Sequence, residues 1–239
     1  SEILAAALQD YKRAIVLGSK QTFGKGTVQN MVDLNRIISG STYGDLGAVK
    51  LTTDKFYRIN GGSTQLEGVK SDVVILDRYS YIDLGEKDQE NPLSWDYIEP
   101  TTFDFWHDEI DYKYMLERSE GRMKSSQYIS LIEEQAQWVK QQQDEYDYTL
   151  NYSNLYKEKE FEKKKINKFK KLNEFESGLE FEWLPEPGKN TVNKEITLRR
   201  DRWIKSLKGD FYIDEATNIL EDLNLKNYNK LAQLKTRKD

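Results

Sequence analysis

The sequence predicts an α+β fold, in which a partial α/β core with a mixed sheet is followed by a mostly helical C-terminal domain. Short runs of β-branched and aromatic residues, separated by glycine-rich turns, fill residues 14–76. From residue 108 onward, apolar residues instead recur at helical spacing. The 5 Trp, 15 Tyr and 9 Phe among 239 residues supply large side chains for a core, although the mean hydropathy is −0.82. We therefore expect a folded chain, because disordered chains are poor in aromatic residues.

The first predicted domain is residues 1–77. It opens with a helix over residues 2–11, on which Ile3, Ala7 and Leu8 share one face. A loop is expected at residues 35–47 and a turn at 60–63, where glycines are frequent. The expected strands are residues 14–18, 28–34, 48–53, 56–59 and 73–76.

The second predicted domain, residues 78–107, is an acidic connector. Residues 77–120 carry 13 acidic and 4 basic side chains, and prolines at 92 and 100 favour a loop. We expect the connector to pack on the preceding core through large rings, because their burial is strongly favourable. Those rings are Trp95, Tyr97, Phe103, Phe105 and Trp106.

The third predicted domain is residues 108–239. A linker is expected at residues 178–193, which hold two prolines and two glycines, and the last dozen residues are expected to fray. Residues 149–152 are compatible with a short strand. The expected helices are residues 108–118, 125–146, 156–174 and 210–223.

Composition excludes several kinds of site. Without cysteine there is no disulfide, thiolate metal site or cysteine nucleophile. His107 is the one histidine, so a hydrolytic site needs another base. For His107 we favour a surface position over a metal site shared with nearby carboxylates. No apolar run approaches the roughly 18 residues that a membrane helix needs.

The charge pattern argues against a dedicated nucleic-acid binder. The net charge is −5. Residues 157–171 hold eight lysines, which is the one basic run to consider. Phe161 and Phe169 fall on the apolar stripe of that helix, so we favour a solvated helix face with a packed stripe.

Lys25 lies between two glycines, a pattern that invites comparison with a phosphate-binding loop. Gly18 precedes Gly24 by six residues rather than five, residue 26 is glycine rather than serine or threonine, and a strand follows. The nucleotide-binding alternative predicts thermal stabilisation by ATP. An isolated Gly-Lys-Gly would otherwise be a tight turn with a solvated lysine.

The order of these segments resembles the carboxyl-terminal processing proteases, and in particular their tail-specific branch. The resemblance covers nearly the whole chain, and its most specific part is the helix, strand and Gly-Lys-Gly-x-x-Gln in the family's order and spacing. That part consists of residues 1–10, 13–18 and 22–29. Weaker matches are Leu51-Thr52, Phe56-Tyr57, Gly61, Gln65, Gly68-Val69, Asp72, 92–96, 150–152 and 212–216.

The resemblance implies a serine endopeptidase with a Ser-Lys dyad, which processes or degrades proteins recognised by their C-terminal tails. In the family motif Ser-Ala-Ser-Glu-Ile the first serine is the nucleophile. Ser1 matches the second serine, so the nucleophilic serine and its oxyanion-hole amide are expected upstream of Ser1 and absent from this chain. The family's peptide-binding PDZ domain is absent too. We therefore expect this chain alone to be inactive.

By the same resemblance, Lys25 matches the general base and Gln29 the residue that orients it. A lysine deprotonates a serine only in its neutral form, which desolvation favours. A glutamine accepts a hydrogen bond from the lysine nitrogen without adding negative charge. Asp10 also aligns with a family aspartate, although we favour an exposed helix carboxylate near Lys12 and Arg13. The loop at residues 18–22 is one residue longer than the family pattern.

The resemblance implies neither a cofactor nor a metal. It implies protein or peptide substrates with accessible C-terminal tails, an adaptor protein as a further partner, no nucleic acid and a periplasmic location. The alternative is a non-catalytic binding or scaffold module on a protease fold. The residue two positions before Ser1 distinguishes the two.

Overall fold

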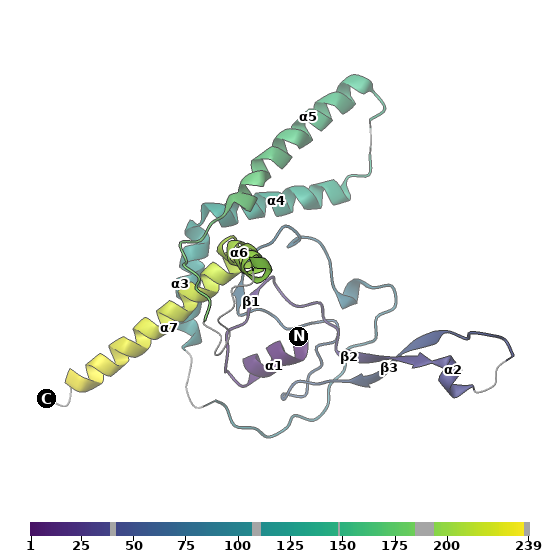
Figure 1. The fold of residues 1–239 in the computed structure, drawn as a ribbon, viewed down its shortest axis with the longest axis horizontal. Coiled ribbons are helices and arrows are strands. Elements are labelled where there is room, and N and C mark those ends of the chain that lie inside the picture. Colours follow the sequence, from purple (N-terminus) through teal and green to yellow (C-terminus); the bar gives the residue numbers. More distant parts are fainter. Residues whose placement is uncertain (39–41, 107–110, 148, 185–193, 237–239) are drawn as a thin grey trace. The chain divides into compact units, whose positions relative to one another are not determined.

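The computed structural model describes residues 1–38, 42–106, 111–147, 149–184 and 194–236 (Figure 1). Contacts divide the chain into two compact units. Unit 1 comprises residues 1–72 and 83–110, and unit 2 comprises residues 73–82 and 111–239. Unit 1 combines a helix with an antiparallel ribbon, and unit 2 is mostly helical, so the predicted α+β class is confirmed.

Unit 1 combines the opening helix with a two-stranded ribbon and several shorter elements. Its ordered segments are α1 (Glu2–Asp10), β1 (Leu17–Gly18), β2 (Thr27–Asp33), α2 (Leu34–Ile37), β3 (Ala48–Lys55) and the 3-10 helix η1 (Glu86–Asp88). Strands β2 and β3 pair antiparallel, and a bulge interrupts the register between Val28 and Gln29. The short helix α2 follows β2 directly at the far end of this ribbon (Figure 1).

The opening helix and the strands at 28–34 and 48–53 are confirmed within one or two residues. The strand predicted at 14–18 is reduced to β1. The strand predicted at 56–59 is wrong: β3 continues to Lys55, and the backbone then turns, with Arg58 N–H donating to Gly62 O at 2.8 Å. The loop predicted at residues 35–47 is wrong for its first three residues, 35–37, because these belong to helix α2.

Residues 83–106 are largely without regular structure, as their composition predicts, and pack within unit 1. Trp95 Nε1 donates to Ser63 O at 2.9 Å. The Phe103 ring packs edge-on against Tyr11 at 5.7 Å between centroids, and against Phe105 at 5.0 Å. Aromatic side chains thus fix this irregular segment.

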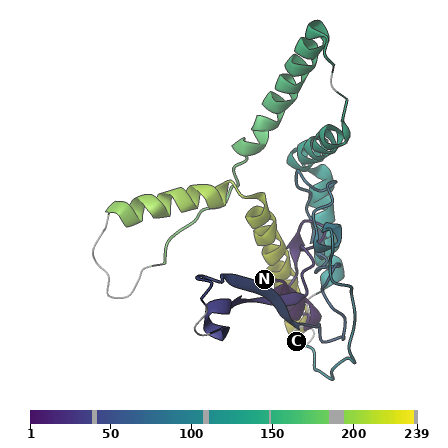
Figure 2. The ribbon, with the colours of Figure 1, turned by 90° about the vertical axis from the view of Figure 1, so that its right-hand side faces the viewer.

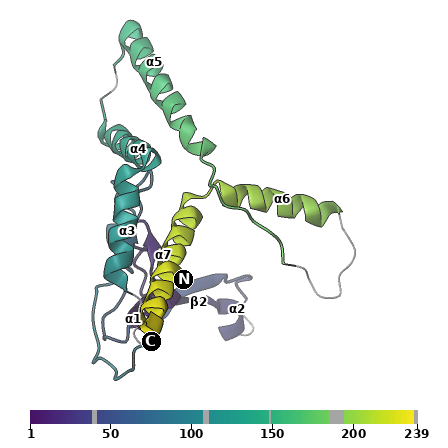
Figure 3. The same ribbon diagram turned by 90° about the vertical axis from the view of Figure 1, so that its left-hand side faces the viewer.

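Unit 2 contains the remaining elements. These are β4 (Val73–Val74), α3 (Tyr112–Ser125), α4 (Gln127–Asp144), α5 (Tyr152–Phe169), the 3-10 helix η2 (Lys170–Glu174), α6 (Lys194–Lys208) and α7 (Phe211–Thr236). Helices α3 and α7 lie side by side (Figures 1 and 3), and α6 leads into α7 at a sharp bend (Figure 2). The buried apolar residues of its helices are Met115, Ile129, Ile132, Ala136, Phe169, Phe211 and Ile219.

Three expectations for unit 2 are corrected. The strand at 149–152 is wrong, because Asn151 caps α5 by accepting a hydrogen bond from the Asn154 amide. Helix α6 is not among the expected helices. Helix α7 continues to Thr236, where the prediction is a frayed end. Residues 185–193 of the expected linker lie outside the described residues.

The apolar stripe of the lysine-rich helix α5 is only partly buried. Phe169 is buried and lies 5.7 Å from the Trp138 ring, between centroids. Phe161 is 58% exposed, so its predicted burial is wrong. Lys165 and Lys168 both pair with the Glu134 carboxylate of α4. These ion pairs and the Phe169 contact join α5 to α4.

Candidate active site

The loop that carries Lys25 needs glycine at both neighbouring positions. Gly24 has a φ of +89°, a conformation that residues with a Cβ rarely adopt. A Cβ added to Gly26 would lie 2.6 Å from the backbone nitrogen of Gln65, so this position has no room for a side chain. The loop then enters β2 at Thr27, and Lys25 is half-buried at that junction.

Lys25 and Gln29, which the sequence predicts as partners, meet in the structure. Lys25 Nζ donates to Gln29 Oε1 at 3.0 Å. Gln29 Nε2 points to Thr52 Oγ1 on β3, at 3.5 Å. The amide nitrogen of Gln29 is therefore directed toward the ribbon, and its oxygen toward the lysine.

The backbone on either side of Lys25 is held by two side chains from elsewhere in unit 1. Gly24 N–H donates to Glu2 Oε1 at 2.7 Å, and Gly26 N–H donates to Gln65 Oε1 at 2.9 Å. Sequence reasoning gives Glu2 and Gln65 no functional role, because their partners are 22 and 39 residues away. These contacts also oppose a phosphate loop: both glycine amides are already engaged, and a strand follows.

Ser1 is exposed and caps α1 without a side-chain hydrogen bond. Among the described residues, no hydrogen bond joins its hydroxyl to Lys25. The structure thus joins Lys25 and Gln29 by a hydrogen bond, and among the described residues neither of them bonds to the Ser1 side chain.

The expectation that Asp10 is an exposed carboxylate near Lys12 and Arg13 is wrong. The Asp10 side chain is 10% exposed and forms an ion pair with Arg58. Arg58 Nε donates to its two oxygens at 3.1 and 3.0 Å, and Arg58 Nη2 donates to Gln9 Oε1 at 3.0 Å. Asp10 therefore anchors α1 to the segment after β3.

Other predicted positions add no chemistry in the part of the chain that the structure describes. His107 lies outside the described residues. Among the described side chains, no group of three or more His, Cys, Asp and Glu is placed to hold a metal ion. No described helix is both long and apolar enough to cross a membrane.

Comparisons with known proteins find two matching families and several relatives. The family described as the C-terminal domain of tail specific protease matches residues 79–224, and peptidase family S41 matches residues 1–75. A "Tail-specific protease" of Haemophilus influenzae is 46% identical over 103 residues, which cover 43% of this chain and 14% of that protein. A "Carboxy-terminal-processing protease" of Bartonella bacilliformis is 43% identical over 75 residues, which cover 31% of this chain and 15% of that protein. The chain thus aligns with about one seventh of each relative's length.

Proposed function

On the premise that the chain belongs to the tail-specific protease family, as the match over residues 79–224 shows, we propose that residues 1–77 form the second half of a serine endopeptidase core. In this proposal Lys25 is the general base of a Ser-Lys dyad, and Gln29 orients it. The acidic connector (78–107) and the helical domain (108–239) complete the proposed organisation.

The observation that carries the proposal is the 3.0 Å contact between Lys25 Nζ and Gln29 Oε1. An amide oxygen fixes the direction of the lysine nitrogen without a negative charge that would hold the nitrogen protonated. The hydrogen bonds to Gly24 and Gly26 limit backbone motion around it. A half-buried lysine in a fixed orientation is what a general base requires.

The proposed reaction uses these groups in sequence. Neutral Lys25 takes the proton of the serine hydroxyl as the oxygen bonds to the substrate's carbonyl carbon. The tetrahedral intermediate collapses, the C–N bond breaks and the new ammonium of Lys25 gives its proton to the leaving amine. Lys25 then deprotonates a water that hydrolyses the serine ester, which frees the acid product and restores the serine.

We further propose that the 239-residue chain alone has no peptidase activity, because Ser1 matches the non-catalytic serine of the motif. The longer protein would act on polypeptides with accessible C-terminal tails, with an adaptor protein as a further partner. Its proposed location is the periplasm, and fractionation of cells that express it would test this.

The test is cleavage of an unstructured protein, such as casein, by a longer protein that includes the segment upstream of Ser1. Lys25→Ala should abolish cleavage, and the control Lys20→Ala, at an exposed lysine of the preceding loop, should retain it. The 239-residue chain should be inactive in the same assay. If the longer protein binds the substrate but does not cleave it, or cleaves it without Lys25, the dyad is wrong and the scaffold-module alternative gains support.

A further inference from the structure

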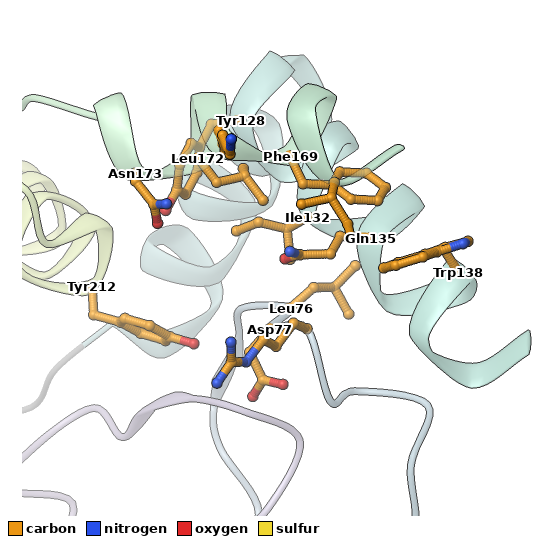
Figure 4. Close-up of a pocket in the computed structure, with 13 residues that line it drawn as sticks. Leu76, Asp77, Tyr128, Ile132, Gln135, Trp138, Phe169, Leu172, Asn173 and Tyr212 are labelled. Carbon is orange, nitrogen blue, oxygen red and sulfur yellow. The ribbon is translucent and has the colours of Figure 1, made fainter. Parts of the chain in front are cut away.

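The Lys25 loop, residues 23–26, has supports that lie beyond residues 1–75, the stretch that matches the peptidase family. These supports come from residues 85–98 of unit 1. Unit 2 has a cavity of about 390 Å³ among α4, the end of α5 with η2 and the start of α7, but none of the described residues that bond to the Lys25 loop lines it (Figure 4). Within the described part of the C-terminal family match, the segment at 85–98 is thus the one bonded to this loop.

Glu86 contacts the Lys25 loop through both its backbone and its side chain. Its N–H donates to Phe23 O at 2.8 Å. Its Oε1 accepts from Gln65 Nε2 at 3.2 Å, and Gln65 Oε1 in turn accepts from Gly26 N–H at 2.9 Å. The contacts of Glu86 therefore reach the backbone on both sides of Lys25, directly at one end and through Gln65 at the other.

The Glu86 carboxylate helps to set the direction of the Gln65 amide. Gln65 is fully buried, so both hydrogens of its nitrogen need acceptors inside the protein. They find them in Glu86 Oε1 and in Leu93 O, at 3.2 and 3.1 Å. A carboxylate and a carbonyl can only accept here, so they face the amide nitrogen and leave the amide oxygen for Gly26 N–H.

The turn that carries Gln65 is held by the same segment. Trp95 Nε1 donates to Ser63 O at 2.9 Å, and Ile98 N–H donates to Gly61 O at 2.8 Å. A Cβ added to Gly61 would lie 2.1 Å from Ile98 O, so the two backbones touch at this point. The segment thus fixes both the Gln65 side chain and the backbone from which it projects.

From these contacts we propose that Glu86 is a positioning residue for Lys25, so that the peptidase site of this protein extends past the peptidase-family match. The inference rests on the proposed role of Lys25 as a general base. No described hydrogen bond joins Glu86 to Lys25 itself, so Glu86 acts through the backbone at Phe23 and through Gln65. A general base works only while its nitrogen stays within hydrogen-bond reach of the proton it takes. A loop that moves more should therefore lower kcat and leave KM nearly unchanged.

Three variants separate the two contacts of Glu86. Glu86→Gln keeps an oxygen that accepts from Gln65, so it should retain most of the wild-type kcat. Glu86→Leu removes that acceptor at similar size and should lower kcat about threefold or more. Glu86→Pro also removes the N–H that donates to Phe23 O and should lower kcat about tenfold or more. Proline suits this position because Glu86 begins η1 and Gly85 before it is extended, with φ −152° and ψ 172°.

The measurement is cleavage of casein by the longer protein, from which kcat and KM are obtained for each variant. KM should stay within about twofold of the wild type, because Glu86 is not expected to touch the substrate. The matched control is Glu90→Leu, at an exposed glutamate of the same segment whose side chain has no hydrogen bond or ion pair among the described residues. This control should cleave like the wild type.

Hydrogen exchange of the 239-residue chain tests the positioning without catalysis. The peptide that contains residues 23–27 should exchange about tenfold faster in Glu86→Pro than in the wild type, and Glu90→Leu should leave it unchanged. This result does not need Lys25 to act as a base. It therefore stays valid if Lys25→Ala leaves cleavage by the longer protein intact and the dyad fails.

Several results would overturn the proposal. These are a wild-type kcat in both Glu86→Leu and Glu86→Pro, a raised KM at unchanged kcat, which would indicate a substrate contact, and unchanged exchange of residues 23–27 in Glu86→Pro. A kcat for Glu86→Gln as low as that of Glu86→Leu would also overturn it, because the hydrogen bond to Gln65 would then not be the cause. If Glu86→Pro does not fold, the comparison of the Gln and Leu variants decides, in kcat and in exchange alike.

Discussion

The Gln65 side chain is fully buried, and its amide group joins three separate parts of unit 1. Its oxygen accepts from Gly26 N–H at 2.9 Å. Its nitrogen donates to Glu86 Oε1 at 3.2 Å and to Leu93 O at 3.1 Å. One residue thus links the backbone next to Lys25 to the segment at 86–93.

We predict that Gln65→Leu loosens the Lys25 loop. The variant leaves the buried Gly26 N–H without its acceptor, which costs about 1–3 kcal/mol. Hydrogen exchange measured by mass spectrometry should show faster exchange in the peptide that contains residues 24–27. The control is Gln143→Leu, an exposed glutamine on α4, which should leave this peptide unchanged. Unaltered protection in Gln65→Leu would show that Gln65 does not hold the loop.

A second prediction rests on the proposed dyad and concerns Gln29→Glu in the longer protein of the cleavage test. A carboxylate 3.0 Å from Lys25 Nζ would favour the ammonium form, which cannot act as a base. Cleavage at pH 7 should fall about tenfold or more, because the neutral fraction of an amine falls about tenfold when its pKa rises by one. The pH at half-maximal kcat should also rise. Gln29→Ala should lower kcat without that rise, and a pH profile of Gln29→Glu identical to the wild type would contradict the prediction.

At the residue scale, prediction succeeds where function rests on a short motif and fails where it rests on distant partners. Lys25 and Gln29 are four residues apart, so their spacing carries the signal. Gln65 and Glu2 act on the same loop from far along the chain. The prediction for Asp10 fails for the same reason, because Arg58 is 48 residues away.

At the scale of elements, α3 and α7 are joined by a buried ionic cluster. Arg122 Nη2 lies 2.8 Å from Glu215 Oε1, and Arg122 Nη1 lies 2.5 Å from Asp222 Oδ2. Ser119 Oγ donates to Glu215 Oε1 at 2.6 Å, and Arg118 Nε donates to Asp222 Oδ1 at 3.1 Å. The side chains of Glu215 and Asp222 are only 2% and 5% exposed, so their charges depend on these partners.

We predict that Arg122→Met lowers the free energy of unfolding of unit 2 by about 3–5 kcal/mol, because two buried carboxylates lose their main partner. Urea unfolding followed by circular dichroism at 222 nm measures the change. Lys113→Met on the same helix is the matched control: Lys113 pairs with Glu117 at 3.9 Å, and both are exposed. The control should change stability by less than about 1 kcal/mol. Equal effects of both variants would refute the role of the cluster.

The same cluster predicts acid sensitivity. Burial alone would raise the pKa of Asp222, but hydrogen bonds from Arg122 and then Arg118 outweigh it and hold the pKa below its usual value. Because the folded-state pKa is lower than the unfolded value of about 3.9, the stabilisation is present above that value and is lost as the pH falls through the folded pKa.

Burial and the Glu215 charge raise the pKa of the neighbouring Asp214, which contributes in the opposite direction. Arg122 also lowers the pKa of Asp214, so its removal acts on both carboxylates in the same direction, and the difference in stability between the wild type and Arg122→Met reports their combined effect. Measured by urea unfolding from pH 7 to pH 2.5, that difference should be constant above about pH 5 and shrink below about pH 4. A difference that grows toward low pH would contradict this assignment.

Helical periodicity predicts α4 well, because Ile129, Ile132 and Ala136 form a buried stripe. It misses α6, although Ile196, Trp203, Ile204 and Leu207 recur there at helical spacing; none of the fifteen residues of α6 is buried. The strand at 149–152 is predicted because the apolar and aromatic residues there are typical of strands. In the structure, the Asn151 side chain instead caps the first turn of helix α5. A helix cap depends on one hydrogen bond, so it gives a weaker sequence signal than an apolar stripe that repeats along a helix.

At the scale of the whole molecule, composition and contacts divide the chain differently. Composition predicts domains at 1–77, 78–107 and 108–239 because charge and proline content change there. Contacts group 83–110 with 1–72, and 73–82 with the helices, because partners such as Gln65 and Leu93 are distant in sequence. For example, Tyr81 Oη donates to Glu133 Oε1 of α4 at 3.2 Å. The compositional boundaries stay a prediction.

The β2–β3 ribbon has two chemically different faces. Residues directly opposite in an antiparallel pair share a face, and side chains alternate along each strand. Gln29 therefore faces one side together with Thr52, its opposite residue. The other side carries Val28, Asn30 and Val32 of β2 with Val49 and Leu51 of β3, and Val28, Val49 and Leu51 are 40%, 39% and 46% exposed. The three exposed apolar side chains of this face mark a surface for further contacts.

The last prediction concerns this apolar face in the 239-residue chain. Because water-exposed apolar area favours association, the chain should bind the dye ANS and gain mean mass in sedimentation velocity as its concentration rises. Val49→Glu with Leu51→Glu should reduce both effects, since charges on an edge-exposed ribbon oppose pairing. Leu150→Glu, at a fully exposed leucine of unit 2, is the control and should change neither. If the wild type binds no dye and stays monomeric, or if the Leu150 control has the larger effect, then the ribbon face is not the surface that drives association.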